Sequence, residues 1–470
     1  MSTFGALNTA YRGLTAAQQG MNVAGQNIAN AATEGYTRQR VDQSSLAAPA
    51  RGLFSGGLLQ AGQGVSVNAI SRLGNSFLDA GVRSAGAQAG YASTRSSALQ
   101  GIEGILQEPG ENGISTALQG FWSAWQGASN QPDDSTAKGL VLQAGNDLAT
   151  KVSSSYRALE AQWSSVRGQA EGAVQAVNAA AAQVAAYNTT IRSTLAAGGS
   201  ANELIDARAK LTETISRLTG GTVREQADGT LDVHVGGNAL VMSGSVRALT
   251  LSGSQTSDKL GASVQLEWAD RPGAAIAVAE GEIAGALSVL APAAKGGAID
   301  AAAQAINKFA GDLRDAVNAL HSGGRKSDGT PADNFFDPAP AGPAALGLAV
   351  LPKGAAEIAV GVAGAGNLDG SLADKISQLG AGPGSPDNVW ESVVTGIGVQ
   401  SRGAQQHESL SSTAEISAQT SRASQASVSL DEENVSLLTN QHAYQAAARV
   451  MTAVDEALDV LINRTGLVGR

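Results

Sequence analysis

The chain of 470 residues contains no cysteine. Disulfides, thiolate catalysis and cysteine-ligated metals are therefore excluded, and mispairing cannot occur if the protein crosses from a reducing into an oxidising compartment. Aromatic residues make up only 4% of the chain, whereas glycine alone contributes 58 residues. Small side chains let helix axes approach closely, so this composition favours helix packing through narrow apolar faces.

Clusters of positive charge and long apolar runs are also missing. The formal net charge is −10, and without clustered Lys and Arg we expect no nucleic-acid partner, because phosphate neutralisation requires such clusters. No run reaches about 18 apolar residues, which predicts no membrane insertion. The nearest candidate, residues 346–366, is interrupted by Pro352, Lys353 and Glu357. The first residues lack a basic region followed by an apolar run, so no conventional secretory signal is expected.

Residue patterns typical of catalysis are absent as well. The histidines, His234, His321, His407 and His442, are far apart and lack zinc-site spacing. Residues 364–370 read GAGNLDG but lack the Lys-Ser/Thr ending of a phosphate-binding loop. The acidic triplet 431–433 precedes an apolar seam, where carboxylates complement a helix N-terminus. The sequence therefore predicts no enzyme, no cofactor and no metal site.

What is present is a seven-residue apolar repeat at each end of the chain. The N-terminal repeat has large residues at Leu7, Leu14, Met21 and Ile28 and small ones at Ala10, Ala17, Ala24 and Ala31. The C-terminal repeat has Leu437, Tyr444, Met451 and Leu458, with Asn440, Ala447, Val454 and Leu461 between them. Such spacing predicts helices with one narrow seam, suited to pairing and to contacts with neighbouring copies. A closed intramolecular bundle would use the same residues and stays an alternative.

Between the ends, we expect a mainly α chain with an inserted β-rich domain. Apolar periodicity predicts helices that break at Pro109-Gly110 and Gly198-Gly199, with a return helix over 202–218 capped by Ser200 or Asn202. Alternation over 231–235 and 264–268 predicts strands. The expected units are a terminal coiled-coil core domain (1–37 and 430–470), a helical-bundle body (38–221, 281–321 and 389–429), an outer β domain (222–280) and a loop-rich excursion (322–388).

Residues 27–39, NIANAATEGYTRQ, resemble the motif shared by bacterial flagellar rod, hook and hook-associated axial proteins. The matching motif positions are Asn27, Asn30, Thr33, Gly35, Tyr36 and Arg38. The C-terminal text, including LDEE at 430–433 and AYQAAAR at 443–449, resembles the flagellar hook-associated protein 1 family in particular. Residues 202–208 (NELIDAR) and 281–290 (GEIAGALSVL) resemble internal segments of that family. Ala209 and residues 427–429 depart from its pattern.

The resemblance implies a structural protein at the hook-filament junction that is required for filament assembly. It implies a flagellar, extracellular location reached through the type III export apparatus without a cleaved signal. The implied partners are further copies in a ring at the hook tip, the hook protein, the second junction protein and a cytoplasmic export chaperone on the C-terminal seam. Another axial protein, of hook or distal rod, is the nearest alternative. A secreted enzyme on a flagellar scaffold is a more distant one.

Overall fold

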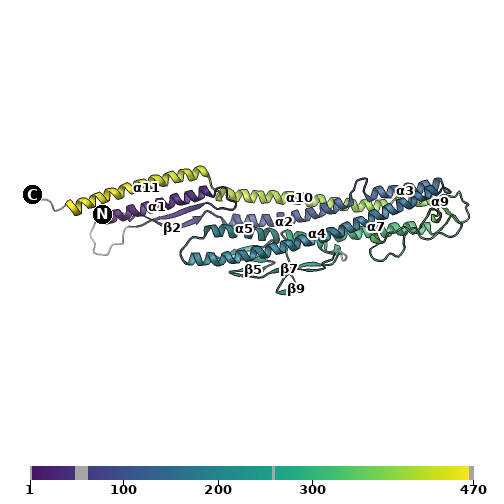
Figure 1. Ribbon diagram of the computed structural model, residues 1–470, viewed down its shortest axis with the longest axis horizontal. Coiled ribbons are helices and arrows are strands. Elements are labelled where there is room, and N and C mark those ends of the chain that lie inside the picture. Colours follow the sequence, from purple (N-terminus) through teal and green to yellow (C-terminus); the bar gives the residue numbers. More distant parts are fainter. Residues whose placement is uncertain (1–2, 48–61, 257–259, 465–470) are drawn as a thin grey trace, which may run out of the picture.

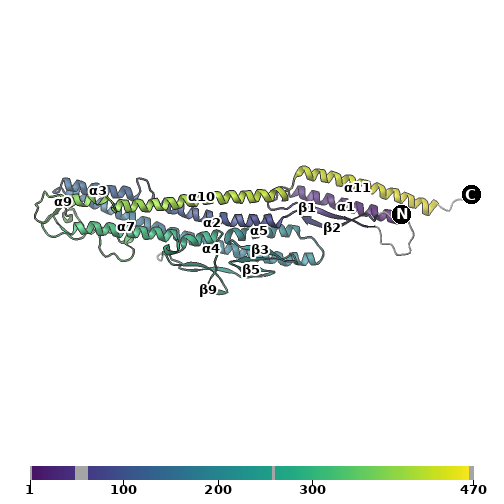
Figure 2. The same cartoon turned by 180° about the vertical axis from the view of Figure 1, so that it is seen from behind.

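The computed structural model describes residues 3–47, 62–256 and 260–464 and shows a long, narrow, mainly helical molecule (Figure 1). The first and last helices run side by side at one tip, and long helices extend away from them with small sheets along one side (Figure 2). The predicted mainly α fold with a β-rich insertion is confirmed. The parts of the expected units at residues 1–2, 48–61, 257–259 and 465–470 lie outside the described residues.

The helices of the described residues range in length from 4 residues in α8 to 62 residues in α4. They are α1 (Thr3–Ala29), α2 (Ser76–Leu106), α3 (Ile114–Asn130), α4 (Ser135–Ala196), α5 (Asn202–Thr219), α6 (Glu282–Leu290), α7 (Ala298–His321), α8 (Ala344–Gly347), α9 (Ser371–Ser377), α10 (Pro386–Ala426) and α11 (Leu430–Asp459). Single turns of 3-10 helix lie at Ala293–Lys295, Ala355–Glu357 and Gln378–Gly380, and a π-helical turn at Val460–Arg464 follows α11.

The 62-residue helix α4 forms the spine of the body. Its N-terminus is capped by Asp134, whose carboxylate accepts a 2.8 Å hydrogen bond from the Thr136 backbone N–H. As predicted, the chain breaks around Pro109-Gly110, between α2 and α3, and reverses at Gly198-Gly199, between α4 and α5. The backbone of Gly198 has φ +77°, a left-handed conformation that glycine adopts without strain.

The predicted cap of α5 is wrong. Ala201 occupies the N-cap position and makes no side-chain hydrogen bond to the helix. The amide of Asn202 donates instead to Gln39 Oε1 at 3.1 Å and to the Ile70 carbonyl at 2.9 Å. The Asn202 side chain, which was expected to cap the helix, therefore forms hydrogen bonds to residues outside it.

Two antiparallel sheets lie against α4 and α5. One has the order β3 (Thr222–Glu225), β4 (Leu231–Val235), β5 (Asn238–Met242) and β6 (Ser245–Val246), and the other has β7 (Leu249–Gly253), β8 (Val264–Trp268) and β9 (Arg271–Ala275). The strands expected at 231–235 and 264–268 are confirmed. Val233, Val241 and Leu266 pack in one core cluster with Val184 of α4 and Ile215 of α5. The sheets thus cover the helical hairpin that precedes them.

Residues 322–388 add short elements to the body. They contain the two-residue strands β10 (Gly324–Arg325) and β11 (Gly361–Val362), the helices α8 and α9 and irregular chain. Phe335 and Phe336 are fully buried in the same core as Phe121 and Trp125 of α3, and the Trp125 and Phe335 ring centroids lie 5.4 Å apart. The loop-rich segment is therefore built into the core of the helical body.

A hairpin joins the terminal helices to the body. Strands β1 (Gln39–Ser45) and β2 (Val65–Arg72) pair antiparallel beside α1.

Candidate assembly site

Helices α1 and α11 pack antiparallel along their length, so that the chain ends meet at one tip (Figures 1 and 2). Three contacts fix their register, each displaced by seven residues along both helices. They are Asn27 with Glu433, Gly20 with Asn440, and Gly13 with Ala447. A seven-residue step on both partners is the spacing of a coiled-coil seam.

The small residues of α1 make the close contact. Ala10, Ala17 and Ala24 are buried, with exposed fractions of 6%, 4% and 1%, and Gly20 is buried against Asn440. The large residues of the predicted N-terminal seam stay partly exposed: Leu7, Leu14, Met21 and Ile28. The helical seam is shorter than predicted, because α1 ends at Ala29 and Ala31 is exposed.

On α11 the predicted seam is also only partly covered. Its partly exposed members are Leu437, Asn440, Tyr444, Ala447, Met451, Val454 and Leu458. Leu461 lies beyond α11 in the π-helical turn, and 58% of it is exposed. The contact between α1 and α11 within one chain thus leaves part of the apolar surface of both helices exposed.

Asn27 is the centre of the motif that follows α1. Its side chain is 1% exposed and donates to Glu433 Oε2 at 3.0 Å and to the Gln39 carbonyl at 2.9 Å. Its Oδ1 accepts from the Gln39 backbone N–H at 3.0 Å and from the Tyr36 hydroxyl at 2.9 Å. One asparagine therefore ties α1 to α11 and to the strand that leaves the motif.

The tyrosine of the motif is held protonated. Burial, followed by the negative charges of Glu203, Asp206 and Glu433, raises the pKa of Tyr36 to about 12. Its hydroxyl can therefore donate to Asn27 throughout the physiological pH range.

Arg38 connects the motif to the start of α11. Its Nε donates to Glu433 Oε1 at 2.7 Å, and its Nη1 to Glu432 Oε2 at 2.6 Å. The Glu433 side chain is 3% exposed, whereas that of Glu432 is 64% exposed. The acidic triplet does open the helix, as predicted, but Glu433 is also the buried partner of two motif residues.

Other motif positions shape the turn itself. Asn30, the first residue after α1, donates to the Gln26 carbonyl in the last turn of that helix, and the Thr33 hydroxyl donates to Asn30 Oδ1. Gly35 has φ +83°, where a side chain would be strained. Among the six predicted motif positions, Asn27, Tyr36 and Arg38 thus bind across elements, while Asn30, Thr33 and Gly35 form the bend.

Helix α5 anchors the other side of the motif. Asp206 accepts from the Thr37 backbone N–H at 3.0 Å, from the Thr37 hydroxyl at 2.8 Å and from Arg72 Nε at 2.8 Å. Glu203 accepts from Gln39 Nε2 at 3.0 Å. Sequence reasoning singled out the NELIDAR segment only as a resemblance and missed these contacts. The spacing of Asn202, Glu203 and Asp206, which places these polar side chains on one face of a helix, was the available signal.

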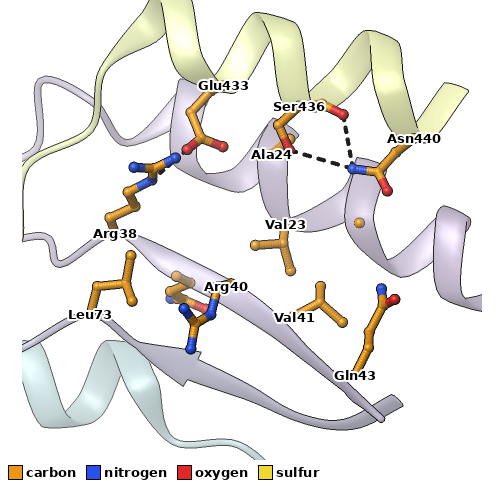
Figure 3. A pocket seen from close by; sticks show the side chains of 12 residues that line it. Val23, Ala24, Arg38, Arg40, Val41, Gln43, Leu73, Glu433, Ser436 and Asn440 are labelled. Carbon is orange, nitrogen blue, oxygen red and sulfur yellow. Dashed lines mark hydrogen bonds and ion pairs between the residues drawn. The ribbon is translucent and has the colours of Figure 1, made fainter. Parts of the chain in front are cut away.

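A groove opens where these elements meet (Figure 3). It has a volume of about 320 Å³ and lies between α1, β1 and α11, with Val23 and Val41 on its walls. Asn440 lines it and donates to the Ser436 carbonyl at 2.8 Å. Arg38, Arg40 and Glu433 also line it, so the groove presents apolar, amide and charged groups side by side, as the surfaces of protein interfaces do.

Within the described ranges, no group of three or more His, Cys, Asp or Glu side chains could hold a metal ion. The His321 ring forms hydrogen bonds to backbone groups of Asp333 and Ala359. The indole N–H of Trp390 donates to Glu108 Oε1 at 2.9 Å. No helix in the described part of the chain is long and apolar enough to span a membrane.

Comparisons with known proteins agree with this picture. A family model described as the helical domain of the flagellar hook-associated protein FlgK matches residues 99–336. A model of the flagella basal body rod protein matches residues 7–37, and one of the C-terminal region of the basal body rod proteins FlgEFG matches residues 420–464. The two terminal matches cover most of α1 with its motif and all of α11.

Individual relatives and one solved structure are similar as well. Flagellar hook-associated protein 1 of Bacillus subtilis is 28% identical over an alignment of 512 residues, gaps included, that covers 100% of this chain and 100% of the relative. That of Salmonella typhimurium is 26% identical over 70% of this chain and 59% of its own length. The flagellar hook junction protein FlgK from Burkholderia pseudomallei shares the fold, with a TM-score of 0.62 at 14% identity over 74% of this chain and 100% of its own.

Proposed function

The chain belongs to the family of flagellar hook-associated protein 1, and we propose that its helices α1 and α11 are assembly surfaces. The members of this family are structural axial proteins of the bacterial flagellum at the hook-filament junction. Copies associate through α1 and α11 into a ring at the hook tip. The hook protein and the second junction protein are the expected axial neighbours. The predicted domains are the units of this assembly, with the terminal pair at the axis and the β domain outward.

The observation that carries this proposal is the apolar surface left on the terminal pair. Besides the partly exposed seam residues, α11 exposes Val435, Leu438 and Val450 by 64%, 55% and 50%. Exposed apolar surface of this extent is unusual on a protein that acts alone. Burying one Leu, Val or Met side chain against a neighbour contributes about 1.5 to 3 kcal/mol.

Export fits the same surface. The terminal helices are stabilised by packing more than by their own propensity, because most helical stability in proteins comes from packing of an apolar face. A cytoplasmic chaperone that covers the C-terminal seam would prevent premature association, and neighbouring copies would replace it after type III export to the cell exterior. The protein acts as a structural component with no catalytic activity.

Deleting the gene in the source bacterium tests the proposal. Electron microscopy should show bare hooks, and flagellin should appear in the culture medium because filament subunits are exported without a junction to grow on. Missing hooks would place the protein lower in the axis. Normal filaments would contradict a junction role altogether.

A further inference from the structure

A second hollow lies apart from the terminal pair, at the joint between the helical body and the β-rich part. It has a volume of about 430 Å³ and lies between α2, α5 and strands β3 and β4. Three arginines line it: Arg72, Arg83 and Arg208. The contacts of these three side chains decide what the hollow can bind.

Arg208 is the deepest of them, with 1% of the residue exposed. Its Nη1 donates to Asn188 Oδ1 and to the Gly229 carbonyl, both at 2.8 Å, so the side chain is fixed under the first hairpin of the β-rich part. Its Nε is buried and has no hydrogen-bond partner among the described residues. A buried N–H without an acceptor costs free energy, most of all on a charged group.

Arg83 enters from α2 and is partly buried. Among the described residues it makes neither a hydrogen bond nor an ion pair within 4.0 Å. Burial lowers the pKa of Arg83 and that of Arg208 from the usual guanidinium value, because both charges have lost water. Arg72, by contrast, is engaged by Asp206 and Thr37.

The carboxylates in the wall attract these two charges from a distance but form no ion pair with either of them. Asp79 and Glu225 line the hollow, but neither forms an ion pair with Arg83 or Arg208, and Asp79 lies 3.8 Å from Arg422 instead. Ala209 lines this hollow and an adjoining one of about 390 Å³, and it offers no polar group. The wall therefore combines unused guanidinium donors with empty volume.

We propose that this hollow binds a small oxyanion, with Arg83 and Arg208 as its donors. Guanidinium groups form charge-assisted hydrogen bonds to phosphate and carboxylate oxygens, and a bound anion would give the charges of Arg83 and Arg208 a counter-ion inside the hollow. The bound anion joins α2, α5 and the start of the β-rich part, which stabilises the joint between body and β domain. Its source is either a free ion such as phosphate or the carboxylate side chain of a second copy.

The test uses the full chain and inorganic phosphate as the probe. The midpoint of thermal unfolding is measured while millimolar sodium phosphate replaces sodium chloride at constant ionic strength and pH. A site in the folded state raises the midpoint by a constant increment for each tenfold rise in phosphate above its dissociation constant. Low concentrations matter, because concentrated phosphate stabilises folded proteins in general.

Two variants decide whether the response comes from this hollow. Arg83→Gln should abolish it, while Arg40→Gln, at a side chain that is 65% exposed and pairs with Asp42 on β1, should leave it intact. Ala209→Asp supplies a built-in carboxylate and should raise the midpoint without phosphate while removing the response. Arg208 itself is left unchanged, because its loss could prevent folding of the hairpin above it.

Sedimentation velocity across protein concentrations separates the two sources. If phosphate weakens self-association, a carboxylate of a second copy uses the hollow, and if it stabilises the fold without that effect, a free ion does. The proposal is overturned if phosphate and chloride shift the midpoint equally in the wild type. It is equally overturned if both Arg83→Gln and Ala209→Asp respond as the wild type does.

Discussion

Asn27 and Glu433 are 406 positions apart in the chain, yet the Asn27 amide donates to the Glu433 carboxylate at 3.0 Å inside the base of the terminal pair. The same carboxylate accepts from Arg38, and the same amide group serves Gln39 and Tyr36. This contact therefore sets the register of α1 on α11 and simultaneously holds the bend that leads into the body.

Removing that carboxylate should loosen the terminal pair. Glu433→Ala leaves Asn27 and Arg38 without a buried acceptor, and we expect a loss of about 3 kcal/mol, typical of breaking a buried pair from one side. Glu432→Ala is the matched control, since its side chain is 64% exposed, and it should cost less than about 1 kcal/mol. Hydrogen exchange of α1 and α11 amides measures both. Equal protection in the two variants would refute the role assigned to Glu433.

The close approach of the helices makes a second prediction at two glycines of α1. A Cβ at Gly20 would overlap the side-chain amide of Asn440, whereas a Cβ at Gly25 would meet nothing within 4 Å. Gly25→Ala should therefore stabilise α1 by about 0.5 to 1 kcal/mol through helix propensity alone. Gly20→Ala should not show this stabilisation, because the new methyl group displaces the Asn440 side chain.

Combining Gly20→Ala with Asn440→Ala should recover most of the gain, because the displaced side chain is then gone. Hydrogen exchange of α1 amides reads out each variant. If Gly20→Ala alone proves as stabilising as Gly25→Ala, the helices do not approach as closely as the structure has them.

A third prediction concerns the seams as assembly surfaces. Leu14→Asp or Met451→Asp places a charge on a partly buried apolar face, which costs about 2 kcal/mol or more when a neighbour covers it. We expect purified chains with a folded body and β domain but no stable incorporation at the hook tip, judged by immunogold labelling of isolated hooks. Gln18→Asp and Gln445→Asp, at exposed positions of the same helices, are the controls. Normal filaments in both seam variants would refute the proposed surfaces.

The fourth prediction is a pH dependence from His321, at the end of α7. Its Nδ1 lies 2.7 Å from the Asp333 carbonyl and its Nε2 accepts from the Ala359 N–H at 3.1 Å, an arrangement that requires the neutral ring. Burial lowers the pKa of His321 below the ordinary 6.5. The unfolded chain thus binds the proton first, and folding stability should fall as pH drops below about 6.5 and level off below the folded pKa.

The slope can reach about 1.4 kcal/mol per pH unit. The free energy of unfolding is measured in urea from pH 7.5 to 5 for the wild type and for His321→Gln. The difference between the two proteins isolates the contribution of His321 from that of the carboxylates, which both share. His407→Gln, at an exposed position on α10, should track the wild type. Parallel pH profiles for wild type and His321→Gln would contradict this reading of the buried ring.

Sequence alone determined the features that repeat locally. Apolar periodicity located the terminal helices and the helical body, and alternation predicted β4 and β8 with the bounds that the structure has. These succeed because a side chain's direction relative to its neighbours follows from the backbone period of one element. The glycine breaks and the acidic start of α11 are equally local signals.

Only the tertiary structure decided which groups meet. In the tertiary structure the Ala and Gly face of α1 makes the close contact with α11, and the Leu face stays partly exposed. The hydrogen bonds of Asn27 with Glu433 and of Asp206 with Thr37 likewise exist only in the folded chain. The tertiary structure also packs residues 322–388 into the body through Phe335 and leaves Arg83 and Arg208 around a hollow. Such contacts depend on how elements far apart in the chain are oriented, and a repeat within one element carries no information about the partner that will face it.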